Sequence, residues 1–376
     1  MGNRRNRQTR RRIIKNSKVF KTVVIILLIA IIFLLFQVII NKVKISKSQK
    51  EIMRANNEIK TNILTSFEAA NNEIDNTDNY KTNTLIRFAV LGDVYSDERM
   101  INYINENDDL DYIVNDVEQY FTNTDFTISS DFEKSTDEDN ASFNEKINKI
   151  GINTFDYTKN EENEIKIIEK KGTKIAIIEC NQDDYNEEDI NNKLKYANEN
   201  TNFSIVLIKW KDTKSTSITE DEENIVNSLI SNGANIIIGT NSNYLKQMEI
   251  KKNENGKDCF VIYSIGSFLT SSSTEKNKNG LILNLQVLID TEGKSSLNKV
   301  NYNRCYMNDY GSNNEERYKI LDVKNEIDKY ENKLNEEKNG VNKNVYNTNI
   351  TNEAIIDKRT YNKLKNSINF IEGIVK

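Results

Sequence analysis

The sequence predicts an α/β fold that is preceded by one transmembrane helix and extended by helices at its C-terminal end. Three observations support this prediction. From residue 85 onward, short apolar runs bounded by Gly and Asn alternate with amphipathic segments, which is the pattern of strands and helices in one domain. A nearly uninterrupted apolar run occupies Thr22–Ile40. Between residues 311 and 376, apolar residues recur at helical spacing.

The run Thr22–Ile40 is predicted to cross a membrane. At a rise of 1.5 Å per residue it spans about 28 Å, close to the thickness of the hydrocarbon core. Nine Lys and Arg residues and no acid precede it within residues 1–21. This asymmetry predicts a basic cytoplasmic tail at residues 1–21 and an extracytoplasmic position for the rest of the chain. The run is long for a cleavable signal peptide and no small-x-small motif follows it, so an uncleaved signal anchor in the cell membrane is predicted.

Residues 41–84 are predicted to form a helical stalk and a polar linker. The apolar positions that define the stalk helix are Ile52, Ile59, Ile63, Phe67 and Ile74. Their spacing by sevens and fours indicates one amphipathic helix. Two roles remain open for its apolar stripe: self-association as a short coiled coil, or packing against the ectodomain.

Composition excludes several classes of chemistry. The 376 residues include no His and no Pro, so His-ligated metals and Ser-His-Asp triads are excluded. Cys180, Cys259 and Cys305 show no Cys-x-x-Cys spacing, and the first two lie in or beside apolar runs, where they are predicted to be small buried hydrophobes. Removing the nine N-terminal charges from the net charge of −5 leaves −14 for residues 22–376, a poor match for nucleic acid.

The ectodomain is predicted to occupy residues 85–310. Its expected strands are Leu85–Leu91, Asp125–Ser130, Lys174–Cys180, Phe203–Ile208, residues 236–238, Leu245–Lys251, Cys259–Tyr263 and Asn279–Ile289. Its expected helices are Asp97–Asn105, Leu110–Phe121, Ile190–Glu199 and Ile218–Asn232, the last with Thr219 at its start. The segment Phe143–Phe155 is expected to be a helix followed by a strand.

Three turns at strand ends are the predicted location of a site. The first strand runs into Gly92 and Asp93, the strand at residues 236–238 runs into Gly239–Asn243, and the strand at Cys259–Tyr263 leads to Gly266–Phe268. This order resembles that of the CapA-type capsule-synthesis proteins, relatives of the calcineurin-like metallophosphatases. The resemblance runs from Leu85 to about Gln286 and implies a two-sheet sandwich of metallophosphatase type.

The chain departs from that family at the family's metal ligands. Gly239–Asn243 reads Gly-Thr-Asn-Ser-Asn where the family has Gly-His-His-Pro-His, and Lys209 stands where the family has the His of His-Trp-Gly. The family's Asn-Asn-His motif has no counterpart. Carried over position by position, the resemblance implies a vestigial pocket of Asp93, Glu133, Lys209, Trp210, Thr240, Asn241, Asn243 and Ser267. These residues are poor ligands for Zn or Mn, so no metal and no cofactor are expected.

Two of these residues carry open alternatives. Lys209 could replace the lost metal charge and pair with Asp93, or it could be a solvated lysine at a strand end. Glu133 could match the family's metal-site Glu, or it could be an ordinary solvated acid. Trp210 keeps the family's register, and core packing would explain it without any function.

Residues 311–376 are predicted to form a helical hairpin. The apolar stripe of the first helix is Ile320, Val323, Ile327, Tyr330 and Leu334, and that of the second is Tyr361, Leu364, Ile368 and Ile371. The two stripes could pack on the chain's own domain or receive a partner.

Three functions from different classes remain open. The resemblance implies a non-catalytic scaffold or binding subunit in the synthesis or export of capsule or a polyglutamate-type envelope polymer, working with other polymer-synthesis proteins. The second is an enzyme of altered, metal-independent chemistry, with Asp93 as base or nucleophile and Lys209 as an electrostatic stabiliser. The third is an architectural membrane protein that forms homo-oligomers through its stalk or tail helices.

Overall fold

The computed structural model describes residues 82–95, 97–131, 140–160, 164–211, 214–242, 244–312, 317–338 and 355–375. The chain divides into two compact units, residues 1–80 and 81–376, and every described residue belongs to the second. The predicted membrane span at Thr22–Ile40 and the predicted stalk therefore lie outside the described residues. Within the described part, no helix is long and apolar enough to cross a membrane.

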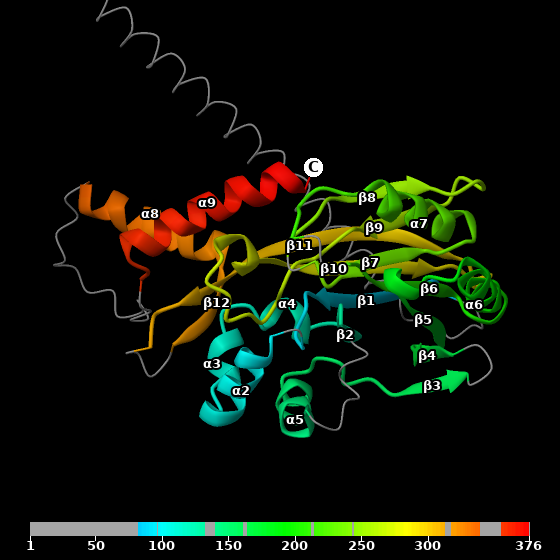
Figure 1. Ribbon diagram of the computed structural model, residues 1–376, viewed down its shortest axis with the longest axis horizontal. Coiled ribbons are helices and arrows are strands. Elements are labelled where there is room, and N and C mark those ends of the chain that lie inside the picture. Colours follow the sequence, from blue (N-terminus) through cyan, green and yellow to red (C-terminus); the bar gives the residue numbers. More distant parts are fainter. Residues whose placement is uncertain are drawn as a thin grey trace, which may run out of the picture. The chain divides into compact units, whose positions relative to one another are not determined.

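Two sheets form the body of this unit (Figure 1). The five-stranded sheet has the order β12-β11-β10-β1-β2 and consists of β1 (Thr84–Leu91), β2 (Phe126–Ser129), β10 (Asn279–Ile289), β11 (Ser295–Asp309) and β12 (Tyr318–Asp322). The seven-stranded sheet has the order β3-β4-β5-β6-β7-β9-β8. Its members are β3 (Tyr157–Asn160), β4 (Ile165–Lys170), β5 (Thr173–Asn181), β6 (Phe203–Lys209), β7 (Ile236–Thr240), β8 (Met248–Lys252) and β9 (Asp258–Ile262). The predicted mixed α/β fold with two sheets is confirmed.

The main hydrophobic core lies between the two sheets. Phe88 and Val90 of β1 and Ile205 and Leu207 of β6 belong to one buried cluster, because alternate residues of each strand point to the same face. Phe88 stacks on Phe126 with ring centroids 4.8 Å apart, where β1 and β2 pair in parallel. The central strands of the seven-stranded sheet are buried on both faces, which explains their continuous apolar sequences.

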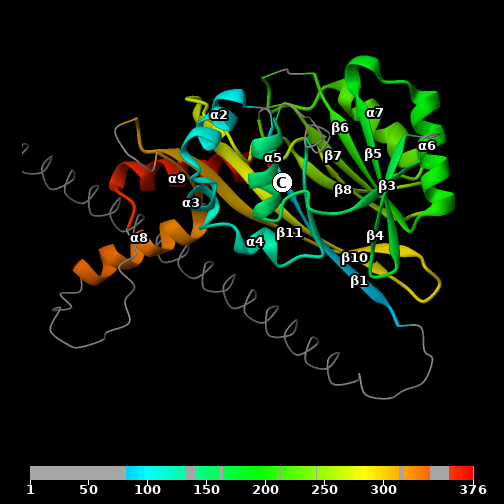
Figure 2. The same ribbon diagram turned by 90° about the horizontal axis from the view of Figure 1, so that it is seen from below.

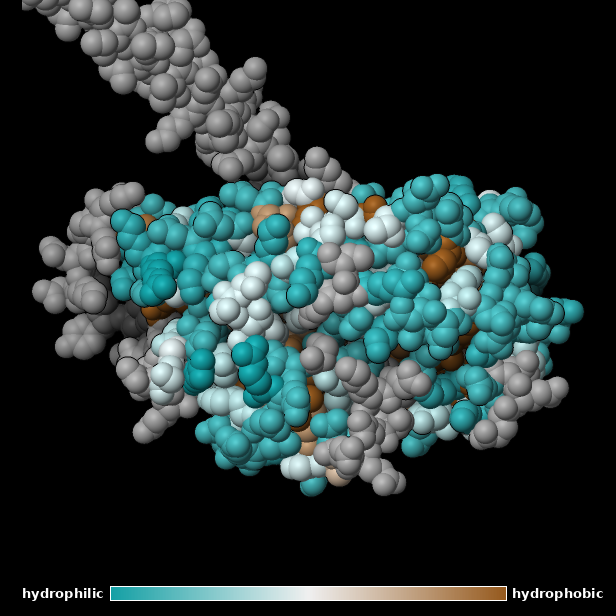
Figure 3. Space-filling model, in the orientation of Figure 1, coloured by the Kyte–Doolittle hydropathy of each residue, from teal (hydrophilic) through white to brown (hydrophobic). Residues whose placement is uncertain are grey.

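Helices cover the outer faces of both sheets (Figure 2). On the five-stranded sheet lie α2 (Glu98–Asn107), α3 (Leu110–Val114), α4 (Gln119–Thr122) and α5 (Ala141–Lys149). On the seven-stranded sheet lie α6 (Glu187–Asn200) and α7 (Glu220–Ser231). Two 3-10 turns, Gln182–Asp184 and Glu275–Lys278, complete these layers. The outer surface is mostly hydrophilic on the face drawn in Figure 3, as expected when the apolar residues fill these cores.

The C-terminal helices pack on the chain's own sheet. The helices α8 (Val323–Lys338) and α9 (Lys358–Ile374) share a buried cluster with Tyr306 of β11 and Leu321 of β12. The rings of Tyr330 and Tyr361 stack with centroids 4.4 Å apart across the two helices. A pair of helices was predicted here, and packing on the chain's own domain is the alternative that the structure supports.

Several boundaries differ from the prediction. The segment Leu110–Phe121 forms two short helices, because a turn at residues 115–118 interrupts it. Ile320 lies in β12, where it pairs with Met307 of β11, although its spacing matches the helix that follows. The helix expected in Phe143–Phe155 ends at Lys149, and no strand follows before β3.

The strands β3, β4, β11 and β12 were not predicted. Residues of β3 are mostly exposed, and β11 mixes Asn and Lys with its apolar residues, so neither strand shows a clear apolar run. Because β12 pairs with β11, the five-stranded sheet continues beyond residue 310.

All three cysteines are free, and burial raises the pKa of each thiol to about 12. Only the thiolate is an effective nucleophile, so these thiols are protonated and inert at neutral pH. Cys259 is buried as predicted, whereas Cys180 is only partly buried.

Alkylation of the folded chain by iodoacetamide at pH 8 should therefore be at least about tenfold slower than alkylation of the denatured chain, at all three cysteines. Peptide mass spectrometry measures each site separately. Rapid labelling of any one of them in the folded chain would contradict the burial described here.

Candidate functional site

Asp93 follows β1 at a point where two segments of backbone nearly touch. A Cβ on Gly92 would lie 2.1 Å from the carbonyl oxygen of Gly266, so glycine is required there. The amide of Asp93 donates to that same carbonyl oxygen at 3.0 Å, and the amide of Phe268 donates to the Asp93 carbonyl oxygen at 2.9 Å. Asp93 and Ser267 form a parallel bridge. The turn at residues 266–268 is thus fastened directly beside Asp93.

The Asp93 carboxylate is buried, with 1% of the residue exposed, and accepts hydrogen bonds from both sheets. The hydroxyls of Ser130 and Thr240 donate to Oδ1 at 2.7 and 2.5 Å, and the amide of Asn241 donates to Oδ2 at 3.3 Å. Ser130 follows β2 of the five-stranded sheet, and Thr240 ends β7 of the seven-stranded sheet. We call these four residues the Asp93 cluster. A buried carboxylate is costly unless it is hydrogen-bonded, so these donors stabilise it and join the sheets.

Trp210 packs behind the turn that begins at Gly239. A Cβ on Gly239 would lie 2.0 Å from the carbonyl oxygen of Tyr263 and 2.1 Å from Trp210 Nε1, so the turn needs glycine. The indole Nε1 donates to that Tyr263 oxygen at 2.6 Å. Asn241 has a left-handed backbone with φ of 67°, which Asn tolerates, and its side-chain amide donates to the Trp210 carbonyl oxygen at 2.8 Å. Trp210 therefore supports the turn, and only 1% of the residue is exposed.

A buried ion pair fixes the chain just after this turn. Lys246 Nζ lies 2.5 Å from Glu222 Oε1, and both side chains are 0% exposed. The second oxygen of Glu222 accepts from the amide of Thr219 at 2.9 Å, within the capping box of α7. The prediction of Thr219 as the helix start is confirmed. The ion pair was not predicted, because the sequence marks Glu222 as a capping residue but does not identify its partner.

Lys209 is not one of the described donors to the Asp93 carboxylate. It ends β6 opposite Thr240 in the sheet, but its side chain is exposed, and no ion pair joins it to Asp93 in the part of the chain that the structure describes. The hypothesis of a Lys209–Asp93 pair was wrong, because hydroxyl and amide donors already reach the buried carboxylate. The alternative, a solvated lysine at a strand end, holds.

The other predicted residues divide into two groups. Thr240, Asn241, Trp210 and Ser267 lie around Asp93 as the resemblance implied, whereas Glu133 and Asn243 lie outside the described residues.

Sequence reasoning missed two residues that follow β2. One is Ser130, which donates to Asp93. The other is Asp131, whose carboxylate accepts from the amides of Val94 and Tyr95 at 2.6–3.0 Å and holds the turn after Asp93. The sequence feature that could have identified both residues is the Ser-Ser-Asp sequence at the end of a predicted strand.

The described residues do not fit the cation site that the resemblance implies. Within the described ranges, no group of three or more His, Cys, Asp or Glu side chains could hold a metal ion. Both oxygens of Asp93 already accept hydrogen bonds from neighbouring groups. Each hydroxyl or amide that donates to the carboxylate occupies a lone pair that a cation could otherwise use.

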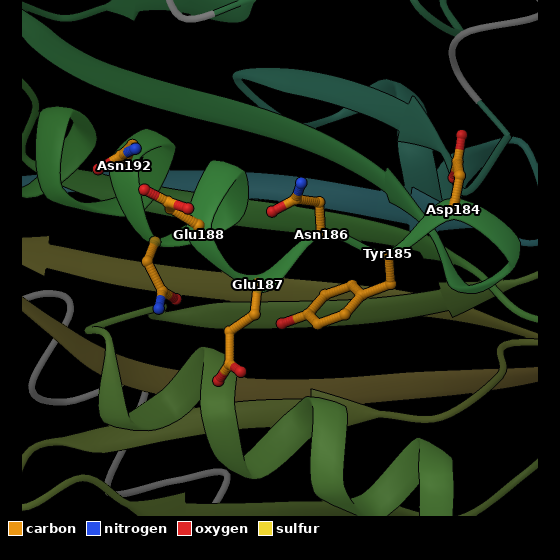
Figure 4. Close-up of a pocket in the computed structure, with 7 residues that line it drawn as sticks. Asp184, Tyr185, Asn186, Glu187, Glu188 and Asn192 are labelled. Atoms are coloured by element: carbon orange, nitrogen blue, oxygen red, sulfur yellow. The ribbon is translucent and has the colours of Figure 1, made fainter.

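An open hollow of about 800 Å³ lies elsewhere, at the start of α6 (Figure 4). Its lining is acidic and includes Asp184, Glu187 and Glu188 but no member of the Asp93 cluster. Glu187 is held by the hydroxyl of Ser228, which donates to its Oε1 at 2.7 Å. An acidic lining alone does not assign a ligand, and this hollow is separate from the predicted pocket.

Comparison with protein families matches residues 132–272 to the model described as "Bacterial capsule synthesis protein PGA_cap". The predicted resemblance is confirmed. The matched segment contains Lys209, Trp210 and the turns at residues 239–243 and 266–268, and it begins after Asp93. No curated protein matches the sequence.

Two solved structures show a weak likeness. The Haemophilus influenzae NAD nucleotidase NadN is 11% identical, with 78% of this chain and 64% of that chain covered and a TM-score of 0.35. A putative 5'-nucleotidase from Staphylococcus aureus, in complex with α-ketoglutarate, is 11% identical, with 77% and 59% covered and a TM-score of 0.31. The chain spans less than two thirds of either structure, and likenesses this low support no conclusion about activity.

The substitution Thr240→Val should lower the free energy of unfolding by about 1.5–3 kcal/mol, because it removes a hydrogen bond to a charged group. Urea denaturation followed by the fluorescence of Trp210 measures this change. The matched control is Lys209→Ala at the neighbouring strand end, which should change the free energy by no more than about 0.5 kcal/mol. An equal loss in both variants would contradict the role given to Thr240.

The substitution Lys246→Met should lower the free energy of unfolding by about 3–5 kcal/mol, because it leaves the Glu222 carboxylate buried without its cation. Adding Glu222→Gln should restore part of that loss. Lys294→Met, at an exposed lysine paired with Glu292, is the control and should have little effect. If Lys246→Met behaved like this control, the ion pair would not anchor the turn.

Proposed function

We propose that this chain is a membrane-anchored, extracytoplasmic protein that acts without catalysis in the synthesis or export of a capsule or polyglutamate-type envelope polymer. The family match at residues 132–272 supports the link to capsule synthesis. The apolar run at Thr22–Ile40 and the nine basic residues before it support the anchor and its orientation.

The absence of catalysis is supported by the hydrogen bonds of the Asp93 cluster. A metallophosphatase activates water with cations held by several carboxylate and imidazole ligands. Here the chain has no His, and the Asp93 carboxylate accepts hydrogen bonds from the hydroxyls of Ser130 and Thr240 and from the amide of Asn241. The hydrogen bonds of the cluster join the two sheets.

The alternative functions receive less support. An enzyme using Asp93 as base or nucleophile would need that carboxylate to reach a substrate, yet only 1% of the residue is exposed. The proposed stabiliser, Lys209, does not contact Asp93. An architectural role through the tail helices is less favoured, because α8 and α9 bury their apolar stripes against β11 and β12.

Complementation of a deletion strain tests the proposal. Cells lacking the protein should lose surface polymer, and both the wild-type chain and Asp93→Asn should restore it to within about twofold at equal protein levels. Asn is close in shape to Asp, and its Oδ1 can still accept hydrogen bonds from the two hydroxyls. The variant therefore keeps most of the hydrogen bonds of the cluster. Purified wild-type chain should also show no phosphoesterase or peptide-hydrolase turnover with Mn²⁺ or Zn²⁺ added.

Two outcomes would contradict the proposal. One is unchanged surface polymer in the deletion strain, which would remove the link to the polymer. The other is metal-dependent turnover that Asp93→Asn abolishes while its unfolding midpoint and protein level stay normal. That result would assign Asp93 to an active site.

A further inference from the structure

The strand β8 is a free edge of the seven-stranded sheet. It pairs with β9 only, and no other described strand lies on its outer side. Figure 1 shows β8 at one margin of this sheet and β3 at the other. Ile250, in the middle of β8, is 56% exposed, the largest exposure among the large hydrophobic residues of the described part. A free edge with an exposed apolar residue is a template for pairing with another strand.

The hydrogen-bond pattern shows which residues of β8 point their backbone outward. The amide of Asn253 donates to the carbonyl oxygen of Lys257, and that of Tyr263 donates to Gln247. In an antiparallel pair, bonded residues alternate along the strand. Odd-numbered residues of β8 therefore bond to β9. Met248, Ile250 and Lys252 present their N–H and C=O groups to the free edge.

Of the antiparallel registers centred on Glu249, Ile250 and Lys251, only one also matches the charges. A register is centred on a residue when that residue lies opposite the same residue of the second copy. Registers centred on Glu249, Ile250 or Lys251 all place the even-numbered, outward-bonding residues of the two copies opposite each other. Centring on Glu249 or on Lys251 places two like charges directly opposite, which is unfavourable. Centring on Ile250 places Glu249 opposite Lys251 of the second copy and Ile250 opposite itself. The sequence of this edge is thus complementary to itself in one register.

We propose that two copies of this chain associate through β8, antiparallel and about a two-fold axis at Ile250. The two seven-stranded sheets then become one continuous sheet. Within one copy, Lys251 Nζ lies 3.3 Å from Glu249 Oε1, so both charged groups lie on the same face and form a row of alternating charges across the contact. A two-fold contact is closed and stops at a dimer.

Cysteine cross-linking of the full chain in detergent tests both the contact and its register. In the proposed register the two Ile250 Cα atoms lie about 5.5 Å apart, within disulfide range. The two Lys252 Cα atoms lie about 13 Å apart along the strands. Mild oxidation should therefore link most of the Ile250→Cys chains, whereas Lys252→Cys should remain at the level of the unsubstituted chain. That background is low because the raised pKa of each of the three native thiols keeps it protonated.

Charge reversal tests the complementarity. Glu249→Lys should weaken dimerisation in sedimentation about tenfold, and the double variant Glu249→Lys, Lys251→Glu should restore it to within about threefold, because the swap recreates the opposite-charge pairs. Lys251 also lies 3.8 Å from Glu223, so the unfolding midpoint of each variant is compared with that of the wild type. If a charge variant fails to fold, the comparison of cross-linking between Ile250→Cys and Lys252→Cys tests the proposal.

The proposal is overturned if Ile250→Cys does not cross-link, or if Lys252→Cys cross-links as well as Ile250→Cys. It is also overturned if a folded double variant does not regain dimerisation. Dimers that persist without the Ile250→Cys cross-link would assign association to another part of the chain, such as the predicted stalk.

Discussion

Hydrogen bonds to the Asp93 carboxylate join the two sheets at the strand ends where the resemblance places a cation site. A carboxylate that is 1% exposed must be compensated, and here two hydroxyls and one backbone amide do so. Each such bond to a charged group contributes about 1.5–3 kcal/mol. Ser130 and Thr240 need no imidazole to do this, which is consistent with a chain that contains no His. The described donors to this acid are hydroxyl and amide groups.

The turns around Asp93 are fixed by close contacts between backbone segments. Gly92 and Gly239 each lie where a Cβ would collide with a carbonyl oxygen of a neighbouring segment. Trp210 fills the space behind the second of these turns, and the buried pair of Lys246 and Glu222 anchors the chain beyond it. These are packing requirements of the turns and do not depend on what the turns bind.

The sequence predicted the parts of this fold that have strong local patterns. Central strands such as β6 and β7 were recognisable because burial on both faces requires continuous apolar runs. The exposed β3 and the Asn-rich β11 were not, because their pairing depends on distant strands. In the site, the resemblance identified Thr240 and Asn241, but no sequence pattern shows how far the end of Lys209 lies from Asp93. Partners distant in the chain, such as Glu222 and Lys246, become visible only when the fold brings them together.

The hydroxyls of Ser130 and Thr240 and the amide of Asn241 donate hydrogen bonds to the Asp93 carboxylate, and we propose that no metal ion binds there. Anomalous diffraction from crystals grown with manganese tests this most directly, because it locates Mn²⁺ without assuming any activity. We expect no anomalous peak within coordination distance of Asp93, with Ser130 and Thr240 still within hydrogen-bond distance of its Oδ1. A fully occupied manganese ion at that carboxylate, with either hydroxyl turned away, would contradict the account.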